Sequence, residues 1–296
     1  YRRSDVEVDQ DVIFIDGLGG AAQRALIGVN QSVQEDVDTY KVNFEYKFND
    51  DIFLYALASS GYRAGGFNPI NPLLGIPPTN YESDTLWNYE VGAKTSWLEN
   101  RLIANTTIYR VDWSDIQLTE QLIGPNGSAT ITGNVGKAKI DGVELELDYR
   151  ATKHLTLGLN LSYMDATIEE DVPTEGTFKG DRLPGSADLS HSLYIDYAQP
   201  ISDELGLSVR LTQRYIGERL TGLGSGSSVQ ANNLVSSYDT TDFRASISHT
   251  NGLEASLFVN NMFNNISFTW IENMPLYTRW RITQPRVMGL NVGYNF

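Results

Sequence analysis

Cysteine is absent from this sequence of 296 residues. The absence excludes a disulfide framework, a thiolate metal site and a cysteine nucleophile together. Long apolar runs are also missing: no stretch of about 18 consecutive apolar residues occurs, so the sequence predicts no transmembrane helix.

Basic charge is scarce. Lys and Arg number 22 against 37 Asp and Glu, which gives a formal net charge of -15. Proteins that bind nucleic acid neutralise phosphates with clustered Lys and Arg. The balance therefore predicts no nucleic-acid partner.

Candidate catalytic groups do not converge. The three histidines, His154, His191 and His249, lie far apart in the chain, and no G-x-S-x-G elbow joins a strand to a helix. Paired carboxylates such as Glu169 and Glu170 lie in a connection and are expected to be solvated. We expect no catalytic residues, no metal ligands and no cofactor.

Alternation with period two is the dominant pattern that is present, and it recurs about eleven times. One example is the segment from Val143 to Tyr149, where four apolar residues alternate with Glu144, Glu146 and Asp148. A strand places such sets on opposite faces. The pattern therefore predicts that Val143, Leu145, Leu147 and Tyr149 face lipid and that the carboxylates face an aqueous interior.

The connections between these strands alternate strictly in length. Short ones fall at 49–51, 98–100, 151–154, 198–204 and 249–252, and long ones at about 63–83, 119–136, 168–187, 217–236 and 264–284. Every second strand end then points the same way, as in outer-membrane barrels with periplasmic turns and extracellular loops. A soluble β-sandwich is the alternative, but its strands are usually about 5–6 residues long. We predict an all-β, antiparallel, up-and-down transmembrane β-barrel.

Four segments make a more specific resemblance. They are 134–147 (NVGKAKIDGVELEL), 61–68 (GYRAGGFN), 257–264 (LFVNNMFN) and the end, 285–296 (PRVMGLNVGYNF). They resemble segments of TonB-dependent outer-membrane receptors, and the stretches 134–147 and 257–264 have the order and the spacing from the end that this family shows. Members of that family have an N-terminal plug inside a 22-stranded barrel, preceded by a TonB box.

The resemblance implies a division of the chain. About 11 strands of a probable 22 are expected, without plug or TonB box. Residues 1–38 are expected to be a segment of a long extracellular loop, and residues 39–296 the C-terminal part of the barrel. Half a barrel leaves two open strand edges, which lipid does not tolerate, so we expect the chain to be part of a longer protein.

Aromatic and Arg side chains in the long connections are the candidate ligand-binding residues. The densest set is Phe268, Trp270, Tyr277, Arg279, Trp280 and Arg281, and a second set is Arg63, Phe67 and Asn68. Rings and guanidinium groups suit a bulky anionic chelate. The alternative for each is packing within a loop or in the aromatic girdle at the membrane interface, and Trp87, Trp97 and Trp113 are expected in that girdle.

The function implied by the resemblance is capture of a scarce extracellular ligand and its import to the periplasm with TonB energy. A ferric siderophore is the default ligand, ahead of cobalamin, an oligosaccharide or an aromatic compound. The implied partners are outer-membrane lipid and lipopolysaccharide, the TonB-ExbB-ExbD complex through an N-terminal part, and the barrel-assembly machinery. That machinery is expected to recognise the terminal strand through Leu290, Val292, Tyr294 and Phe296. A non-transport barrel for adhesion or structure and an outer-membrane barrel hydrolase are the alternatives.

Overall fold

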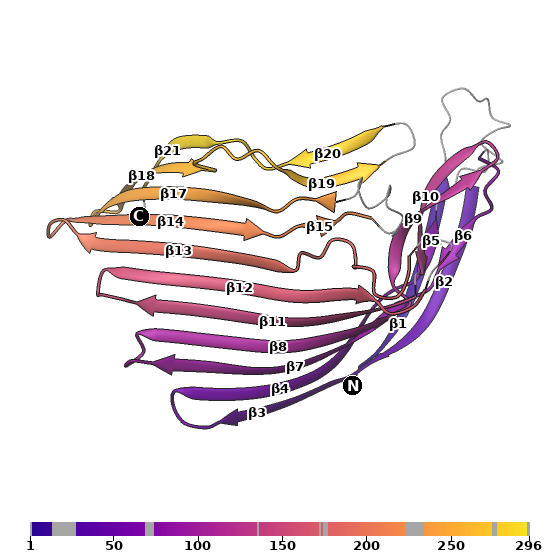
Figure 1. The fold of residues 1–296 in the computed structure, drawn as a ribbon, viewed down its shortest axis with the longest axis horizontal. Coiled ribbons are helices and arrows are strands. Elements are labelled where there is room, and N and C mark those ends of the chain that lie inside the picture. The colour runs from indigo at the N-terminus through magenta and orange to yellow at the C-terminus, as the bar shows by residue number, and fades with distance from the viewer. Residues whose placement is uncertain are drawn as a thin grey trace.

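A single curved antiparallel sheet forms most of the molecule. The structure is a computed structural model, and it describes residues 2–13, 28–68, 74–134, 136–171, 173, 177–222, 234–273 and 277–294. The sheet has 11 strands in the order β21-β18-β17-β14-β13-β12-β11-β8-β7-β4-β3 (Figure 1). Its strands are β3 (Lys41–Lys47), β4 (Ile52–Arg63), β7 (Asp84–Trp97), β8 (Leu102–Ser114), β11 (Lys137–Arg150), β12 (Leu155–Ile168), β13 (Leu189–Pro200), β14 (Leu205–Ile216), β17 (Tyr238–His249), β18 (Leu253–Asn260) and β21 (Val287–Tyr294).

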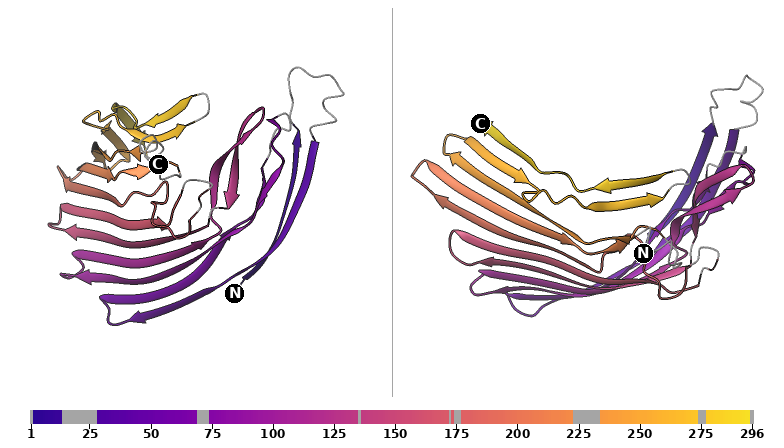
Figure 2. Two further views of the ribbon diagram at one scale, coloured as in Figure 1. Left: turned by 45° about the vertical axis from the view of Figure 1, so that its right-hand side comes forward. Right: turned by 45° about the horizontal axis from the view of Figure 1, so that its top comes forward.

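The up-and-down order confirms the expected fold class and strand number. Each of these strands pairs with its neighbour in sequence within the sheet, and β3 and β21 form its two edges among the described residues. Figure 2 shows the curvature of the sheet, with the short turns at one end and the long connections gathered at the other.

Side chains separate by face as the alternation predicts. Glu144 and Glu146 line a polar hollow on the inner, concave face, whereas Leu147 and Tyr149 line an apolar depression on the outer face. The outer set is extensively exposed, with Ile108 at 60% and Leu290 at 80%. An exposed apolar surface of this extent marks contact with a membrane or a partner. The expected separation of the two sets is confirmed.

Glycines on the inner face receive aromatic rings from neighbouring strands. The ring of Tyr55 covers Gly92, that of Tyr109 covers Gly142, and that of Tyr194 covers Gly158. A Cβ at any of these glycines would overlap the ring. Such cross-strand pairing of an aromatic residue with glycine fixes strand register in a curved sheet, which explains the glycines inside long strands.

The short turns are tight. Between β7 and β8, Leu98, Glu99 and Asn100 have φ of 56°, 59° and 62°. Successive left-handed residues match the right-handed twist of the flanking strands. One end of the sheet is therefore a compact rim.

The long connections contain strands that the sequence patterns did not predict. Separate two-stranded sheets pair β5 (Gly66–Asn68) with β6 (Thr79–Tyr81), β9 (Gln117–Gly124) with β10 (Gly127–Asn134), β15 (Arg219–Leu220) with β16 (Leu234–Val235), and β19 (Phe268–Asn273) with β20 (Thr278–Ile282). Likewise, β1 (Arg2–Ile13) pairs with β2 (Gly28–Thr39) over most of the segment 1–38. Figure 1 places this hairpin at the end of the sheet where the long connections lie.

A small apolar core lies where these connections leave the sheet. It comprises Ile116, Ala138, Ala166, Ile168 and Leu183, with Trp113 packed against it. Trp113 pairs with Ala138 across the strands and therefore shares its face. The expectation of Trp113 in the lipid-facing girdle is wrong, because strand parity turns it to the inner face. Trp87 and Trp97 lie on the outer face and are 38% and 49% exposed.

Candidate ligand-binding surface

The β19–β20 hairpin distributes the densest candidate set over two faces. Ile271 pairs with Trp280, and Trp270 with Arg281. Since neighbours along a strand point to opposite faces, one face carries Ile271, Trp280 and Ile282, and the other carries Trp270, Arg279 and Arg281. Phe268 lies with Trp280, their ring centroids 5.1 Å apart.

The exposed rings and cations of this hairpin differ in their partners. Trp280 is 60% and Tyr277 is 58% exposed. The Nε of Arg279 donates to Glu272 Oε2 at 2.8 Å, which ties this guanidinium to the hairpin itself. Arg281 is exposed. Of the candidate cations here, Arg281 is therefore the better placed to meet a ligand.

Arg219 anchors the hairpin to the neighbouring connection. Its Nη2 donates to the carbonyl oxygen of Thr269, and its guanidinium lies 5.7 Å from the ring centroid of Tyr238. Arg219 is only 9% exposed, and its Nη1 is buried without a hydrogen-bond partner among the described residues. This arginine sets where the hairpin sits relative to the sheet.

The second candidate set forms the base of a different connection. Arg63 makes an ion pair with Asp84, its Nε donating at 2.8 Å, and its guanidinium lies 4.9 Å from the Trp113 ring centroid. Asp84 is 1% exposed and also accepts from the backbone N–H of Gln117 at 3.1 Å. The structure thus places Arg63 in an ionic junction between two connections.

Phe67 and Asn68 continue this junction. They are 8% and 7% exposed. The Asn68 amide donates to the carbonyl oxygen of Thr132 at 2.8 Å and accepts from the Thr132 N–H at 2.7 Å. These bonds dock β10 onto β5, so Phe67 and Asn68 lie inside the loop structure and the exposed hairpin β19–β20 is separate from them.

The inner face below the connections is polar. A hollow of about 590 Å3 is lined by Lys94, Asn105, Glu144, Glu146 and Arg214 among others. Asn105 donates to Glu146 at 2.9 Å, and the Tyr55 hydroxyl bonds Thr107 at 2.9 Å. A wall of this kind can contact water, a hydrophilic solute or a polar protein segment.

The terminal strand pairs with β18 along its length. Leu290, Val292 and Tyr294 are 80%, 68% and 51% exposed on its outer face. Phe296 lies outside the described residues. The apolar alternation expected of an assembly signal is present as far as the structure describes it.

The described part of the chain has no group of metal ligands, and two of its histidines make isolated contacts. No cluster of three or more His, Asp or Glu that could hold a metal ion is present there. His191 stacks on Tyr215 with centroids 5.2 Å apart, and His154 bonds the Ala198 carbonyl oxygen at 2.9 Å. No helix in the same residues is long and apolar enough to cross a membrane.

Three residues that organise these connections were missed from the sequence. Asp84, Gln117 and Glu272 are polar residues whose roles depend on contacts far along the chain or across a hairpin. The Gln117 amide donates to the carbonyl oxygens of Ala64 and Glu82, both at 2.9 Å. A polar residue at a strand boundary gives no pattern from which such a bond can be predicted.

Comparison with known proteins identifies a family from the sequence and finds the same fold in solved structures. Residues 8–262 match the family described as TonB dependent receptor-like, beta-barrel. The pesticin receptor of Yersinia enterocolitica is 29% identical over 139 residues, covering 47% of this chain and 19% of the relative. The probable TonB-dependent siderophore receptor PiuA of Acinetobacter baumannii is 21% identical over 246 residues, covering 79% and 31%.

Two solved structures show the same fold. The ferric yersiniabactin uptake receptor FyuA from Yersinia pestis superposes with a TM-score of 0.74 at 18% identity, covering 91% of this chain and 39% of that one. The copper transporter OprC gives a TM-score of 0.69 at 18% identity, covering 90% and 40%. The chain spans about a fifth to a third of the length of the curated relatives it matches.

Proposed function

Because the chain belongs to the TonB-dependent receptor family, we propose that it is part of a receptor that captures a ferric siderophore and imports it to the periplasm. The family consists of transport proteins of the Gram-negative outer membrane and not of enzymes. The energy would come from the TonB-ExbB-ExbD complex, acting through an N-terminal part of the longer protein. The barrel-assembly machinery would insert that protein through its terminal strand.

The observation that carries the ligand class is the exposed β19–β20 hairpin. Trp270 and Arg281 lie side by side on one of its faces and Trp280 lies on the other, and Trp280 and Tyr277 are more than half exposed. Ferric chelates are bulky, and many are anionic and carry aromatic groups. Aromatic faces stack on such groups, and a guanidinium donates to their oxygens.

The fold supports a transport role. The outer face is apolar and the inner face polar, so a closed barrel of this construction would enclose a wet interior. The long connections gather at one end, where Asp84, Gln117 and Asn68 tie the connection after β4 to the connection after β8. Rigid connections preorganise a capture surface and reduce the entropic cost of binding.

The test is uptake of radiolabelled iron by cells that produce the full-length receptor in a strain lacking other ferric chelate receptors. A panel would include a catecholate, a hydroxamate and a citrate complex of Fe3+. We expect at least one to be imported only when both the receptor and TonB are present. Import of none, with TonB-dependent import of cobalamin or an oligosaccharide instead, would replace the proposed ligand class.

A further inference from the structure

A buried arginine without a charged partner lies at the base of the β19–β20 hairpin. Arg219 is 9% exposed, its Nη2 donates to the Thr269 carbonyl oxygen, and its Nη1 is buried without a hydrogen-bond partner among the described residues. The guanidinium lies 5.7 Å from the ring centroid of Tyr238, within the range of a cation–π contact. A carbonyl oxygen and a phenol ring are both uncharged, so neither neutralises the guanidinium.

The carboxylates nearest to Arg219 in the two adjoining connections pair with other arginines. Glu218 precedes Arg219 in the chain, and its Oε1 lies 3.4 Å from Nη1 of Arg182. Glu272 on the hairpin pairs with Arg279. Among the described residues, no carboxylate forms an ion pair with Arg219.

The sequence of these connections contains no further acid. Apart from Glu218 and Glu272, residues 217–237 and 261–286 include neither Asp nor Glu. Asp239 follows Tyr238 on β17 and is opposite Tyr215, and alternation along the strand turns it to the other face of the sheet from Tyr238. In a protein with a formal net charge of -15, a buried cation without a carboxylate partner is an exception.

A role in anchoring does not account for this charge. A buried charge is costly unless an opposite charge and hydrogen bonds compensate it. Holding the Thr269 carbonyl oxygen requires one N–H donor, which an uncharged Gln or Asn side chain also supplies. A buried guanidinium with a free N–H group and no counter-ion is therefore suited to receive an anion.

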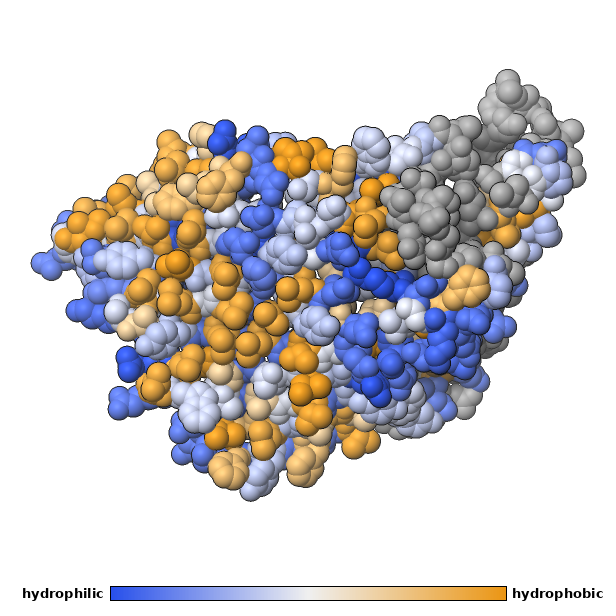
Figure 3. All heavy atoms as spheres, viewed as in Figure 1, coloured by the Kyte–Doolittle hydropathy of each residue, from blue (hydrophilic) through white to orange (hydrophobic). Residues whose placement is uncertain are grey.

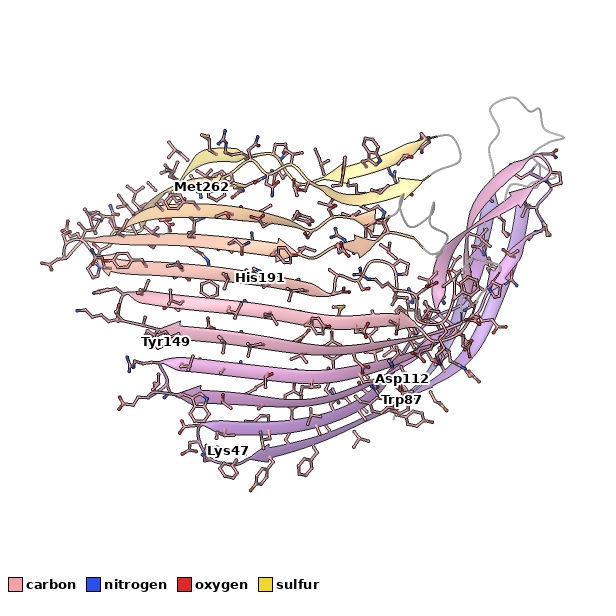
Figure 4. The ribbon with its side chains drawn as sticks, in the orientation of Figure 1. Lys47, Trp87, Asp112, Tyr149, His191 and Met262 are labelled. Carbon is pink, nitrogen blue, oxygen red and sulfur yellow. The ribbon has the colours of Figure 1, made fainter. Side chains whose placement is uncertain are left out.

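The position of Arg219 suits a ligand that arrives from water. In Figure 3 hydrophilic residues gather toward the end of the molecule where the long connections lie. From Met262, labelled in Figure 4, the chain leaves β18 and continues to the hairpin. Tyr238 is opposite Ile216, which lines the polar hollow of the inner face. The Arg219 guanidinium, which lies against Tyr238, is thus on the inner side of the wall, between the hairpin and the hollow.

We propose that Arg219 receives an anionic oxygen of the captured ligand, a carboxylate or a catecholate, at the base of the β19–β20 hairpin. This site deepens the proposed function and rests on it for the identity of the ligand. Nη1 donates to the ligand while Nη2 keeps its bond to Thr269. Access to Nη1 requires the hairpin to part from β15 and β16. Among the described strands β19 and β20 pair only with each other, so no ladder of backbone hydrogen bonds opposes that movement.

Two methionine variants of the purified full-length receptor test the site without a ligand. Arg219→Met removes the charge and keeps an unbranched side chain against Tyr238. Arg182→Met is the matched control, because Arg182 pairs with Asp188 at 2.7 Å and with Glu218, and its loss leaves two carboxylates without a cation. Hydrogen exchange of the backbone amides measures the local stability of both connections.

The two variants should differ in ligand-free protein. Arg219→Met should change exchange of the hairpin amides by less than about threefold, because loss of the bond to Thr269 is offset by removal of a buried charge. Arg182→Met should accelerate exchange of the Gly185 amide, which donates to the Leu220 carbonyl oxygen at 2.7 Å, by about tenfold.

Ligand affinity then separates anion binding from anchoring. Ferric citrate is the anionic probe, and a ferric trihydroxamate is the neutral one. Arg219→Met should lose about thirtyfold in affinity for ferric citrate, as for a charge-assisted hydrogen bond in a buried site, and less than about twofold for the neutral chelate. Arg219→Lys should restore part of the loss, since it returns the charge without the planar fork.

The proposal is overturned if Arg219→Met strongly accelerates exchange in the ligand-free hairpin and weakens both chelates equally, because Arg219 would then be an anchor. If neither chelate binds the wild type, sulfate is the probe, compared with chloride at equal ionic strength. Sulfate should slow exchange of the hairpin amides more in the wild type than in Arg219→Met, and equal slowing in both overturns the anion site. A sulfate effect that depends on Arg219, together with no import of any ferric chelate, would overturn the proposed function and support the anion site.

Discussion

Arg and aromatic side chains gather at two places in the connections. One place is buried within the loop structure, and the other is exposed. At the first, Arg63 lies against Trp113 and pairs with Asp84, which is 1% exposed. At the second, the β19–β20 hairpin presents Trp280 at 60% exposure. Composition alone makes them look alike, since each combines guanidinium groups with large rings.

The two places differ in the hydrogen-bond partner that holds the arginine. A buried carboxylate is stable only when it is paired and fully hydrogen-bonded, and Asp84 receives N–H groups from both Arg63 and Gln117. Arg63 is thereby committed to holding two connections together. The hairpin holds its own Arg279 through an exposed partner, Glu272, and leaves its rings at the surface.

The largest effect is expected at the buried junction. Asp84→Ala removes the acceptor of Arg63 and of the Gln117 N–H. Since one partner is buried and the other half exposed, we expect a loss of about 2 kcal/mol in the local stability of these connections. Hydrogen exchange of the Arg63 and Gln117 amides in the full-length receptor measures it.

Asp50→Ala is the matched control, because Asp50 pairs with Lys47 in a fully exposed turn. Its effect should be close to zero. Equal acceleration of exchange in both variants would show that burial of Asp84 does not distinguish the two ion pairs, and the comparison would fail.

A second large effect is expected at the exposed hairpin, in binding and not in folding. Replacing Arg279 and Trp280 together with Ala removes one side chain from each face. We expect chelate affinity to fall by about 2 kcal/mol if the hairpin is part of a binding hot spot. The amount of folded barrel in the membrane fraction should stay unchanged, since the hairpin lies beyond the sheet. Loss of folded protein in proportion to binding would assign the hairpin a structural role.

The strand order was predictable from sequence, whereas the burial and the contacts of the candidate residues were not. Alternation such as Val143 to Tyr149 is a local property, and it gives the face of each residue directly. Contacts such as Asn68 with Thr132 join residues 64 positions apart, and no local pattern encodes them. Trp113 was misplaced for a related reason: an aromatic residue near a strand end suits the girdle, but parity put it on the inner face beside Ala138.

A smaller effect is expected in the charge selectivity of ligand binding, and it distinguishes Arg281 from Arg63. Arg281→Gln should reduce affinity for an anionic ferric chelate by about 1 kcal/mol, as for loss of a charge-assisted hydrogen bond at an exposed site. Affinity for a neutral ferric trihydroxamate should not change. Arg63→Gln should show no such selectivity, because Arg63 already pairs with Asp84. Isothermal titration on the purified receptor measures both, and a selective loss with Arg63→Gln would reverse the assignment of the two sets.

The smallest effect is expected at the Arg279–Glu272 pair. The pair is exposed, with 50% and 31% of the two side chains accessible, so Glu272→Gln should change stability by less than about 1 kcal/mol. The substitution also releases the Arg279 guanidinium from its carboxylate while keeping the shape of the side chain.

If the arginines of this face receive an anionic chelate, the affinity of the Glu272→Gln variant for that chelate should rise slightly, and the rise should fade with added salt because exposed charges are screened. If instead Glu272 holds Arg279 in its binding position, the same variant should bind more weakly and Glu272→Asp should restore part of the loss. Titration at two salt concentrations separates these outcomes, and unchanged affinity at both would remove Arg279 from the binding face and leave Arg281 and Trp270 as its remaining contacts.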